Sequence, residues 1–394
     1  MTRVAFFTEI LTEDFDGAAR TMFQIINRID SSMYDYLFVY GDDMEQFRSF
    51  KSFKVPRLNI PINKDYNLSI PQMVYYKLEK VLDDFDPEVI HIATPSILGF
   101  YAMNYAKKRN IPILSIYHTH FISYIPFYLQ KLKFLIAPTE YWIKKTMEKF
   151  YNSCDKIYVP SQAMLDALQN FGVESSRMSL WQRGIDRELF NPLKRNPAFV
   201  QRITKNNKPN ILFASRIVWE KNIETLIKIY AELCASDIDF NFIVIGDGKA
   251  REQAEEQMPG AFFLGKKNHD ELAKFYASCD VFVFPSTSET YGNVVVEAMA
   301  SGIPCVISDQ GGSASLVKDN HTGFVCKAYS SRDYVGYILE LLNDSSLRNR
   351  ITEAALAGIA HLGWDKLTQN YFQDIDELSQ SAWQDSKSQL GWAN

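Results

Sequence analysis

The sequence predicts an α/β protein in two domains, each built from parallel strands with covering helices. Short apolar runs of strand length recur along the chain, such as residues 4–7 near its start and 281–285 in its second half. Segments with helical spacing of apolar residues, such as 97–108, separate these runs. That alternation predicts parallel sheets with right-handed crossovers. The 394 residues are too many for one compact core and suit two domains of ordinary size.

The composition excludes two broad classes of protein. Hydrophobic residues make up 46% of the chain, which is enough to bury two cores and argues against disorder. The net charge is −5 and the pI is near 5.8, so there is no overall basic excess to neutralise nucleic-acid phosphates. We therefore expect no nucleic-acid partner.

Cysteine usage and hydropathy predict a cytoplasmic protein. The five cysteines are widely spaced and form no CxxC pair, so we expect neither a disulfide framework nor a zinc site. The N-terminal apolar run covers only residues 4–7, which is too short for a signal peptide. Nowhere do roughly 18 uninterrupted apolar residues occur, so we expect no membrane-spanning segment.

In the first half, the strand at residues 4–7 leads through a polar loop to Asp16 and Gly17 and then to an amphipathic helix. A strand, a glycine loop and a helix form a site where a phosphate can approach a doubly wound sheet. Gly17 could equally be an ordinary turn residue. The loop lacks the GxGxxG pattern, which disfavours a nicotinamide enzyme.

The strand at residues 113–116 is followed by Tyr117, His118, Thr119 and His120, at the edge where open α/β sheets bind ligands. A histidine at this edge, either His118 or His120, can donate to a phosphate or a sugar hydroxyl, or take part in proton transfer near neutral pH. No carboxylate or cysteine stands nearby in the sequence, which argues against a metal pair. The alternative is a polar loop with no ligand.

Residues 121–150 combine many aromatic and aliphatic side chains with five lysines and only two glutamates. Basic residues among aromatic ones are typical of a membrane-surface element, whose apolar face enters the headgroup region while the lysines meet anionic lipid. A packed helical pair with one solvated face is the alternative, and it is the commoner use of such a pattern.

In the second half, a strand at residues 211–214 is followed by Arg216 and then by Lys221 at the start of a helix. Two cations at such a junction suit a diphosphate, because Arg offers a planar fork and Lys a point charge. Surface ion pairs are the alternative. A further strand at residues 262–264 precedes Lys266.

The most informative stretch is a strand, a loop that carries Glu289, and a helix that begins near Asn293. Asn293 and Glu297 are four residues apart and share a helical face. Gly292 lets the backbone come close to a ligand, and the free N–H groups near Val294 at the helix start suit a phosphate. Two carboxylates beside such a start can hold the hydroxyls of a sugar and a ribose. The alternative is a structural strand–loop–helix unit with Glu297 in solvent.

Glu289 and Glu297 bracket seven residues, and this stretch resembles the E-x7-E motif of the family-four retaining glycosyltransferases. Other segments follow in that family's order, so the resemblance covers nearly the whole chain. It implies the GT-B fold, in which two Rossmann-like α/β/α domains face each other across a cleft. We expect an N-terminal domain at residues 1–185, a nucleotide-sugar-binding domain at 186–364, and a last helix at 365–394 that packs back on the first domain.

The same resemblance implies roles for the matching residues. Glu289 would hold the transferred sugar and Glu297 the ribose. Arg216 and Lys221 would hold the leaving diphosphate, and His118 would meet the donor from the opposite domain.

The resemblance also places Lys266 beside the nucleobase and Gly17 near the donor, although Asp16 replaces the first glycine of the family's usual pair. Backbone amides complete the expected donor site at Gly292, Asn293 and Val294. We expect no metal ion and no bound cofactor, since no D-x-D motif follows a strand.

Within that family the chain looks closest to the lipid sugar transferases, which carry a similar insertion after the histidine segment. We therefore expect a retaining hexosyltransferase that uses a nucleotide sugar, such as GDP-mannose or a UDP-hexose. Its acceptor would be a membrane lipid or envelope glycan, reached from the inner face of the membrane through residues 121–150. Three alternatives stay open: a soluble or polysaccharide acceptor, epimerisation of a nucleotide sugar, and nucleotide-sugar binding without catalysis.

Overall fold

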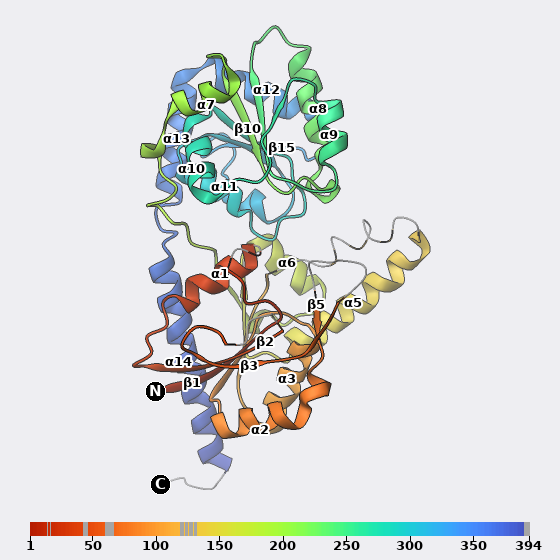
Figure 1. Cartoon of the computed structure of the whole chain (residues 1–394), viewed down its shortest axis with the longest axis vertical. Helices are drawn as coiled ribbons and strands as arrows, with labels where there is room; N and C mark the ends of the chain where they lie inside the picture. Colours follow the sequence, from red (N-terminus) through yellow and green to blue (C-terminus); the bar gives the residue numbers. More distant parts are fainter. Residues whose placement is uncertain are drawn as a thin grey trace.

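The computed structural model describes residues 1–13, 15, 17–41, 46–59, 67–118, 122, 125, 129 and 132–389. The chain forms two halves, each built on a parallel β-sheet, which lie one above the other along the long axis (Figure 1). The predicted α/β architecture is confirmed. The predicted domain boundary at residues 185 and 186 falls in the segment between the two sheets, and it stays a prediction.

The N-terminal sheet has seven parallel strands in the order β3-β2-β1-β6-β7-β8-β9. These strands are β1 (Thr2–Thr8), β2 (Tyr34–Tyr40), β3 (Lys51–Lys54), β6 (Val89–Ile92), β7 (Ile113–Ile116), β8 (Lys156–Val159) and β9 (Met178–Leu180). The larger helices of this half are α1 (Gly17–Ile26), α2 (Tyr75–Phe85), α3 (Ile97–Arg109), α5 (Ile136–Tyr151) and α6 (Gln162–Asn170). A small antiparallel hairpin, β4 (Arg57–Asn59) with β5 (Asn67–Ser69), lies outside the sheet.

The C-terminal sheet has six parallel strands in the order β12-β11-β10-β13-β14-β15. They are β10 (Asn210–Ala214), β11 (Asn241–Ile245), β12 (Phe262–Phe263), β13 (Val281–Phe284), β14 (Cys305–Ser308) and β15 (Phe324–Cys326). Its helices are α7 (Pro197–Thr204), α8 (Ile223–Cys234), α9 (Arg251–Gln257), α10 (His269–Ser278), α11 (Asn293–Ala300), α12 (Ser331–Asn343) and α13 (Ser345–Gly358). The short 3-10 helices η6 (Trp219–Lys221) and η7 (Gly312–Leu316) lie near the ends of β10 and β14.

The N-terminal sheet is covered on both faces. Along β1, Ala5 and Phe7 pack into one apolar cluster, while Val4 and Phe6 pack into another on the opposite face. This follows from the alternation of side chains along a strand. Because both faces are buried, the strand reads in the sequence as a continuous apolar run.

The last helix, α14 (Trp364–Gln389), follows the C-terminal half in the chain but packs on the N-terminal sheet (Figure 1). The Tyr371 hydroxyl lies 2.8 Å from Nδ1 of the buried His91 in β6. Asp376 accepts a 2.8 Å hydrogen bond from the Tyr34 hydroxyl. We expected a last helix at residues 365–394, and the described part of it runs from Trp364 to Gln389.

All five cysteines are free thiols, and four of them are buried. Across the part of the chain that the structure describes, no helix is long and apolar enough to cross a bilayer.

Candidate functional site

The ends of two neighbouring strands bring Lys221 and Glu289 together. β10 and β13 pair in parallel, so the segments that follow them leave the same edge of the sheet. Lys221 ends η6 and Glu289 lies in the loop before α11, and their Nζ and Oε1 atoms are 2.5 Å apart. Their side chains are only 5% and 19% exposed. Ser286 donates a further hydrogen bond of 3.2 Å to the same carboxylate oxygen.

The surroundings keep Glu289 ionised. Burial raises the pKa of its carboxyl, but the Lys221 ammonium, the charge of Arg216 and the Ser286 hydroxyl together bring that pKa below its ordinary value. Arg216 itself is exposed, yet it is near enough to act on this carboxylate. The structure therefore brings three predicted residues into one charged cluster at the strand ends.

Glycines fix the loop that carries Glu289. The Gly312 amide donates a 2.6 Å hydrogen bond to the Glu289 carbonyl. A Cβ at Gly312 would lie 2.0 Å from the Thr290 carbonyl oxygen, so no larger residue fits there. Gly292 precedes α11 with φ at +99°, and a Cβ there would come within 2.6 Å of Cβ of Ser313. Residues 311–313 and 289–292 thus pack backbone against backbone.

Arg183 joins the histidine segment of the N-terminal half to the start of α11. One of its terminal nitrogens donates to the His118 carbonyl at 3.4 Å, and the other reaches Oδ1 of Asn293 at 3.5 Å. The Thr290 hydroxyl donates to the same His118 carbonyl at 3.1 Å. The Tyr291 hydroxyl donates to the Arg183 carbonyl at 3.0 Å. Sequence reasoning assigned no role to Arg183, because a buried arginine between two halves has no local pattern.

His118 lies at this junction with a buried side chain. It is 5% exposed, and among the described residues neither of its ring nitrogens has a hydrogen-bond partner. Burial, with the charges of Arg183 and His91, holds the pKa of His118 well below its ordinary value. The ring is therefore neutral at pH 7 and can both donate and accept. The other histidine of the prediction, His120, lies outside the described residues.

Gly17 begins α1 at the same junction. A Cβ at Gly17 would lie 3.3 Å from Nδ2 of Asn293 and 3.5 Å from a terminal nitrogen of Arg183. The predicted glycine loop therefore faces the start of α11 across the two halves. Its predicted neighbour Asp16 lies outside the described residues.

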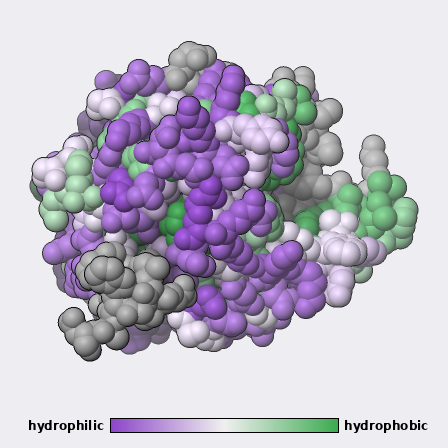
Figure 2. Space-filling view, turned by 90° about the horizontal axis from the view of Figure 1, so that it is seen from below, coloured by the Kyte–Doolittle hydropathy of each residue, from purple (hydrophilic) through white to green (hydrophobic). Residues whose placement is uncertain are grey.

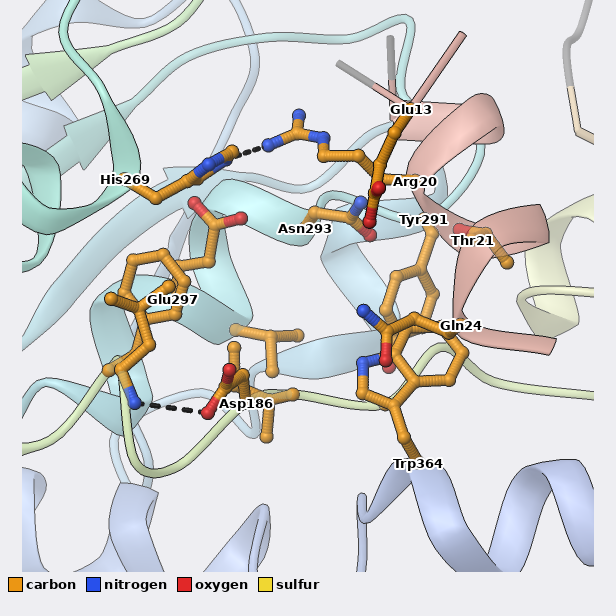
Figure 3. Close-up of a pocket in the computed structure, with 15 residues that line it drawn as sticks. Glu13, Arg20, Thr21, Gln24, Asp186, His269, Tyr291, Asn293, Glu297 and Trp364 are labelled. Atoms are coloured by element: carbon orange, nitrogen blue, oxygen red, sulfur yellow. Dashed lines mark hydrogen bonds between the residues drawn. The ribbon is translucent and has the colours of Figure 1, made fainter. Parts of the chain in front are cut away.

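A pocket of about 180 Å³ opens beside this junction, between α1, α10 and α11 (Figure 3). Asn293 and Glu297 line it from α11, and Arg20 and His269 lie above Glu297 in the view. Glu297 is 7% exposed and accepts a 3.5 Å hydrogen bond from the Tyr276 hydroxyl. Burial raises the pKa of this carboxyl, although Arg20 and Tyr276 oppose the rise.

The predicted residues do not all share one cavity. The lining of the pocket includes Asn293 and Glu297 but not Glu289, Lys221 or His118. The two carboxylates therefore lie in neighbouring regions that the start of α11 connects. Two other predicted residues stand apart from these contacts: Val294, which is half-buried in α11, and Lys266, which is exposed and makes no polar contact with the described members of the site.

The described residues contain no group of three or more His, Cys, Asp or Glu that could hold a metal ion. The groups that could meet an anion are instead Arg216, Lys221, Arg183, Arg20 and the N–H groups at the start of α11. Arg20 and His269 had been missed. An arginine one turn after a glycine loop was the one available signal for them.

Comparisons with known proteins agree with this geometry. Residues 15–189 match the family model described as Glycosyltransferase Family 4, and residues 195–357 match Glycosyl transferases group 1. The sucrose-phosphate synthase of Thermosynechococcus elongatus has a similar structure, with a TM-score of 0.78 over 97% of this chain and 100% of that chain at 16% identity. Together the fold and the site define a glycosyltransferase of the GT-B fold.

More particularly, the two matches together confirm the predicted resemblance to glycosyltransferase family 4, with the E-x7-E stretch inside the second of them. The GDP-mannose-dependent alpha-mannosyltransferase of Corynebacterium glutamicum is 26% identical over 388 residues, which is 96% of this chain and 90% of that protein. The alpha-monoglucosyldiacylglycerol synthase of Streptococcus pneumoniae is 24% identical over 374 residues, 89% of this chain and 82% of that protein.

Proposed function

We propose that this protein transfers a hexose from a nucleotide sugar to a hydroxyl of a membrane lipid, with retention at the anomeric carbon and without a metal ion. The observation that carries the proposal is the buried pair of Lys221 and Glu289, with Arg216 beside it. Two cations next to an ionised carboxylate suit a ligand that joins a diphosphate to a sugar.

In the proposed reaction, Arg216, Lys221 and the N–H groups at the start of α11 stabilise the negative charge that develops on the departing diphosphate. Preorganised donors of this kind contribute several kcal/mol, about 2.7–4 for a single donor. They supply the positive charge that a metal ion supplies elsewhere. Glu289 holds hydroxyls of the transferred sugar, and Glu297 holds the ribose.

His118 meets the sugar from the N-terminal half. Its neutral ring is buried beside the start of α11, where it can exchange hydrogen bonds with sugar hydroxyls. The acceptor hydroxyl attacks the anomeric carbon on the face that the diphosphate leaves. As the new C–O bond forms and the bond to the phosphate oxygen breaks, the hydroxyl proton passes to that oxygen.

The lipid acceptor is supported by one surface of the N-terminal half, which we call the α5 tip. In Figure 1, α5 projects from the body of this half, and Figure 2 shows hydrophobic residues at the projecting end. Its exposed apolar residues are Leu132, Phe134, Leu135, Tyr141 and Trp142. Lys133 and Lys145 are exposed near them, with Lys145 in an ion pair with Glu148, and such a mixture suits an anionic bilayer. Much of the rest of the predicted 121–150 element lies outside the described residues.

The relatives guide the choice of substrates. One curated relative is named for GDP-mannose and another for a glucosyl-diacylglycerol product, so GDP-mannose, UDP-glucose and diacylglycerol are the first substrates to test. A thermal-shift panel of nucleotide sugars identifies the donor, because a ligand that binds the native state raises its apparent stability.

The decisive test is turnover with that donor and vesicles that contain diacylglycerol and anionic lipid, in the presence of EDTA. We expect release of the nucleoside diphosphate together with an α-linked glycolipid, read by mass spectrometry and by the anomeric coupling in NMR. An inverted product, or loss of activity with EDTA, contradicts the mechanism. Donor consumption without glycolipid points to epimerisation or to another acceptor, and binding without turnover points to a non-catalytic module.

A further inference from the structure

Arg20 reaches from one half of the protein to the other. It lies in α1, and its guanidinium hydrogen-bonds Nε2 of His269, the first residue of α10. Figure 3 shows this contact above Glu297, with Asn293 beside it on α11. Arg20 and His269 therefore meet at the edge of the pocket that Glu297 lines.

His269 does not neutralise the charge of Arg20. A guanidinium has donors only, so Nε2 must act as the acceptor, and the imidazole is then neutral. Within the described part of the chain Arg20 forms no ion pair, although its charge acts on Glu297. A guanidinium that pairs with a neutral nitrogen gains a stronger hydrogen bond when a phosphate oxygen replaces that nitrogen.

The surroundings of Arg20 suit such an oxygen. Asn293, the first residue of α11, lines the same pocket as Arg20 and lies beside Gly17 and Arg183. Arg20 is on the next turn of α1 after Gly17, so its guanidinium and the helix start border the same polar space. Glu297 lines the same pocket, where its carboxylate can accept hydrogen bonds from neutral hydroxyl groups such as those of a ribose.

We propose that Arg20 is a donor-binding residue whose guanidinium leaves His269 when the donor binds and then hydrogen-bonds the diphosphate. This inference rests on the proposed function, since it requires a nucleoside-diphosphate ligand. The leaving group is then held from both halves, by Arg216 and Lys221 from one and by Arg20 from the other.

The test is calorimetric binding of GDP, UDP, guanosine and uridine to the full chain and to Arg20→Met, Arg20→Lys and His269→Ala. We expect Arg20→Met to weaken binding of the preferred diphosphate by about tenfold to a hundredfold, the usual range for one hydrogen bond to a charged group. Arg20→Met changes the affinity for the matching nucleoside by less than threefold. Arg20→Lys, which keeps a positive charge, binds the diphosphate more tightly than Arg20→Met does. His269→Ala keeps diphosphate binding within about threefold, because it removes only the partner in the ligand-free state.

Arg332→Met is the matched control, since Arg332 is exposed on α12, outside the lining of this pocket. If Arg20→Met binds the diphosphate as tightly as the parent protein, the inference fails and the proposed function stands. Equal losses in Arg20→Met and His269→Ala also overturn it, because Arg20 would then act only through the contact between the halves. If the parent chain binds no nucleoside diphosphate, the inference and the proposed function fail together.

Discussion

Glu289 and Glu297 belong to one loop and helix, yet their surroundings move their pKa values in opposite directions. Oε1 of Glu289 lies 2.5 Å from Nζ of Lys221. Burial raises the pKa of this carboxyl, but Lys221, Arg216 and Ser286 together bring it below 4.5. Glu297 is also buried but has the Tyr276 hydroxyl and the more distant charge of Arg20, so the pKa rises. The ionised form of Glu289 is stabilised by its neighbours. The ionised form of Glu297 is destabilised by burial, and a ligand that hydrogen-bonds this carboxylate can offset that penalty.

The first prediction is that Glu289→Gln and Glu297→Gln both abolish transfer, but only Glu289→Gln lowers stability. Glu289→Gln leaves the Lys221 ammonium buried without its carboxylate and lowers the free energy of unfolding at pH 7 by about 3 kcal/mol. Glu297→Gln removes a carboxylate that resists ionisation in the folded state, so stability stays equal or rises. Urea unfolding at pH 7 measures both effects.

The pH dependence of the same pair follows from linkage. The folded pKa of Glu289 is lowered, so its contribution is present above pH 4.5 and is lost as the pH falls through the lowered value. Glu297 has a raised folded pKa, so its penalty is absent in acid and grows as the pH rises above 4.5. If both variants unfold at the same urea concentration at pH 7, the assigned environments are wrong.

The second prediction concerns the glycine before α11. Gly292→Ala places a Cβ at φ +99° and 2.6 Å from Cβ of Ser313, so we expect a loss of stability of about 1–3 kcal/mol and weaker donor binding. Gly336→Ala is the matched control, because Gly336 lies inside α12 with nothing within 4 Å of an added Cβ. There we expect a gain of about 0.4–1 kcal/mol. Thermal unfolding measures both effects. Equal melting temperatures for the two variants would contradict this account.

The third prediction tests the α5 tip. Phe134 and Trp142 are 75% and 69% exposed, so Phe134→Ser with Trp142→Ser removes apolar surface without disturbing a core. We expect flotation with anionic vesicles to fall at least tenfold while the melting temperature stays unchanged, since each buried aromatic side chain contributes roughly 1.5–3 kcal/mol. Tyr76→Ser, which changes a residue 85% exposed on α2, serves as the control and keeps vesicle binding. Vesicle binding by the double variant at the level of the parent protein would rule out this surface.

Much of the fold was predictable because both sheets are covered on both faces. Buried parallel strands such as β1 and β13 appear in the sequence as apolar runs, and the residues after them mark the carboxyl edge of the sheet. Glu289 and Lys221 each follow such a strand, but only the resemblance to the glycosyltransferase family assigned them to one site. The edge strand β3 is polar and short, and it has no such pattern.

The contacts between the halves could not be predicted in this way. Arg183, Arg20 and His269 act through partners 65 to 249 positions away, and no local spacing encodes those pairs.

The last prediction is that acid weakens the attachment of α14 through a buried histidine. His91 is fully buried against Tyr371, and burial lowers the pKa of its imidazole to about 3. The unfolded chain takes up the proton near pH 6.5 and the folded chain does not, so unfolding becomes easier as the pH falls below that value. One such group contributes about 1.4 kcal/mol per pH unit, and His118, whose pKa is also lowered, adds to the slope.

Urea unfolding between pH 6.5 and 5.5 isolates this effect, because most carboxyl groups titrate below that window. We expect His91→Gln to lose about half of the slope, whereas Tyr371→Phe lowers stability by about 1–3 kcal/mol at every pH by leaving Nδ1 of His91 without its partner. Tyr371→Phe thus separates the loss of a buried hydrogen bond from the titration of the ring. A parent protein whose stability is flat across this window does not hold these histidines neutral, and the buried contact between α14 and β6 would then need another explanation.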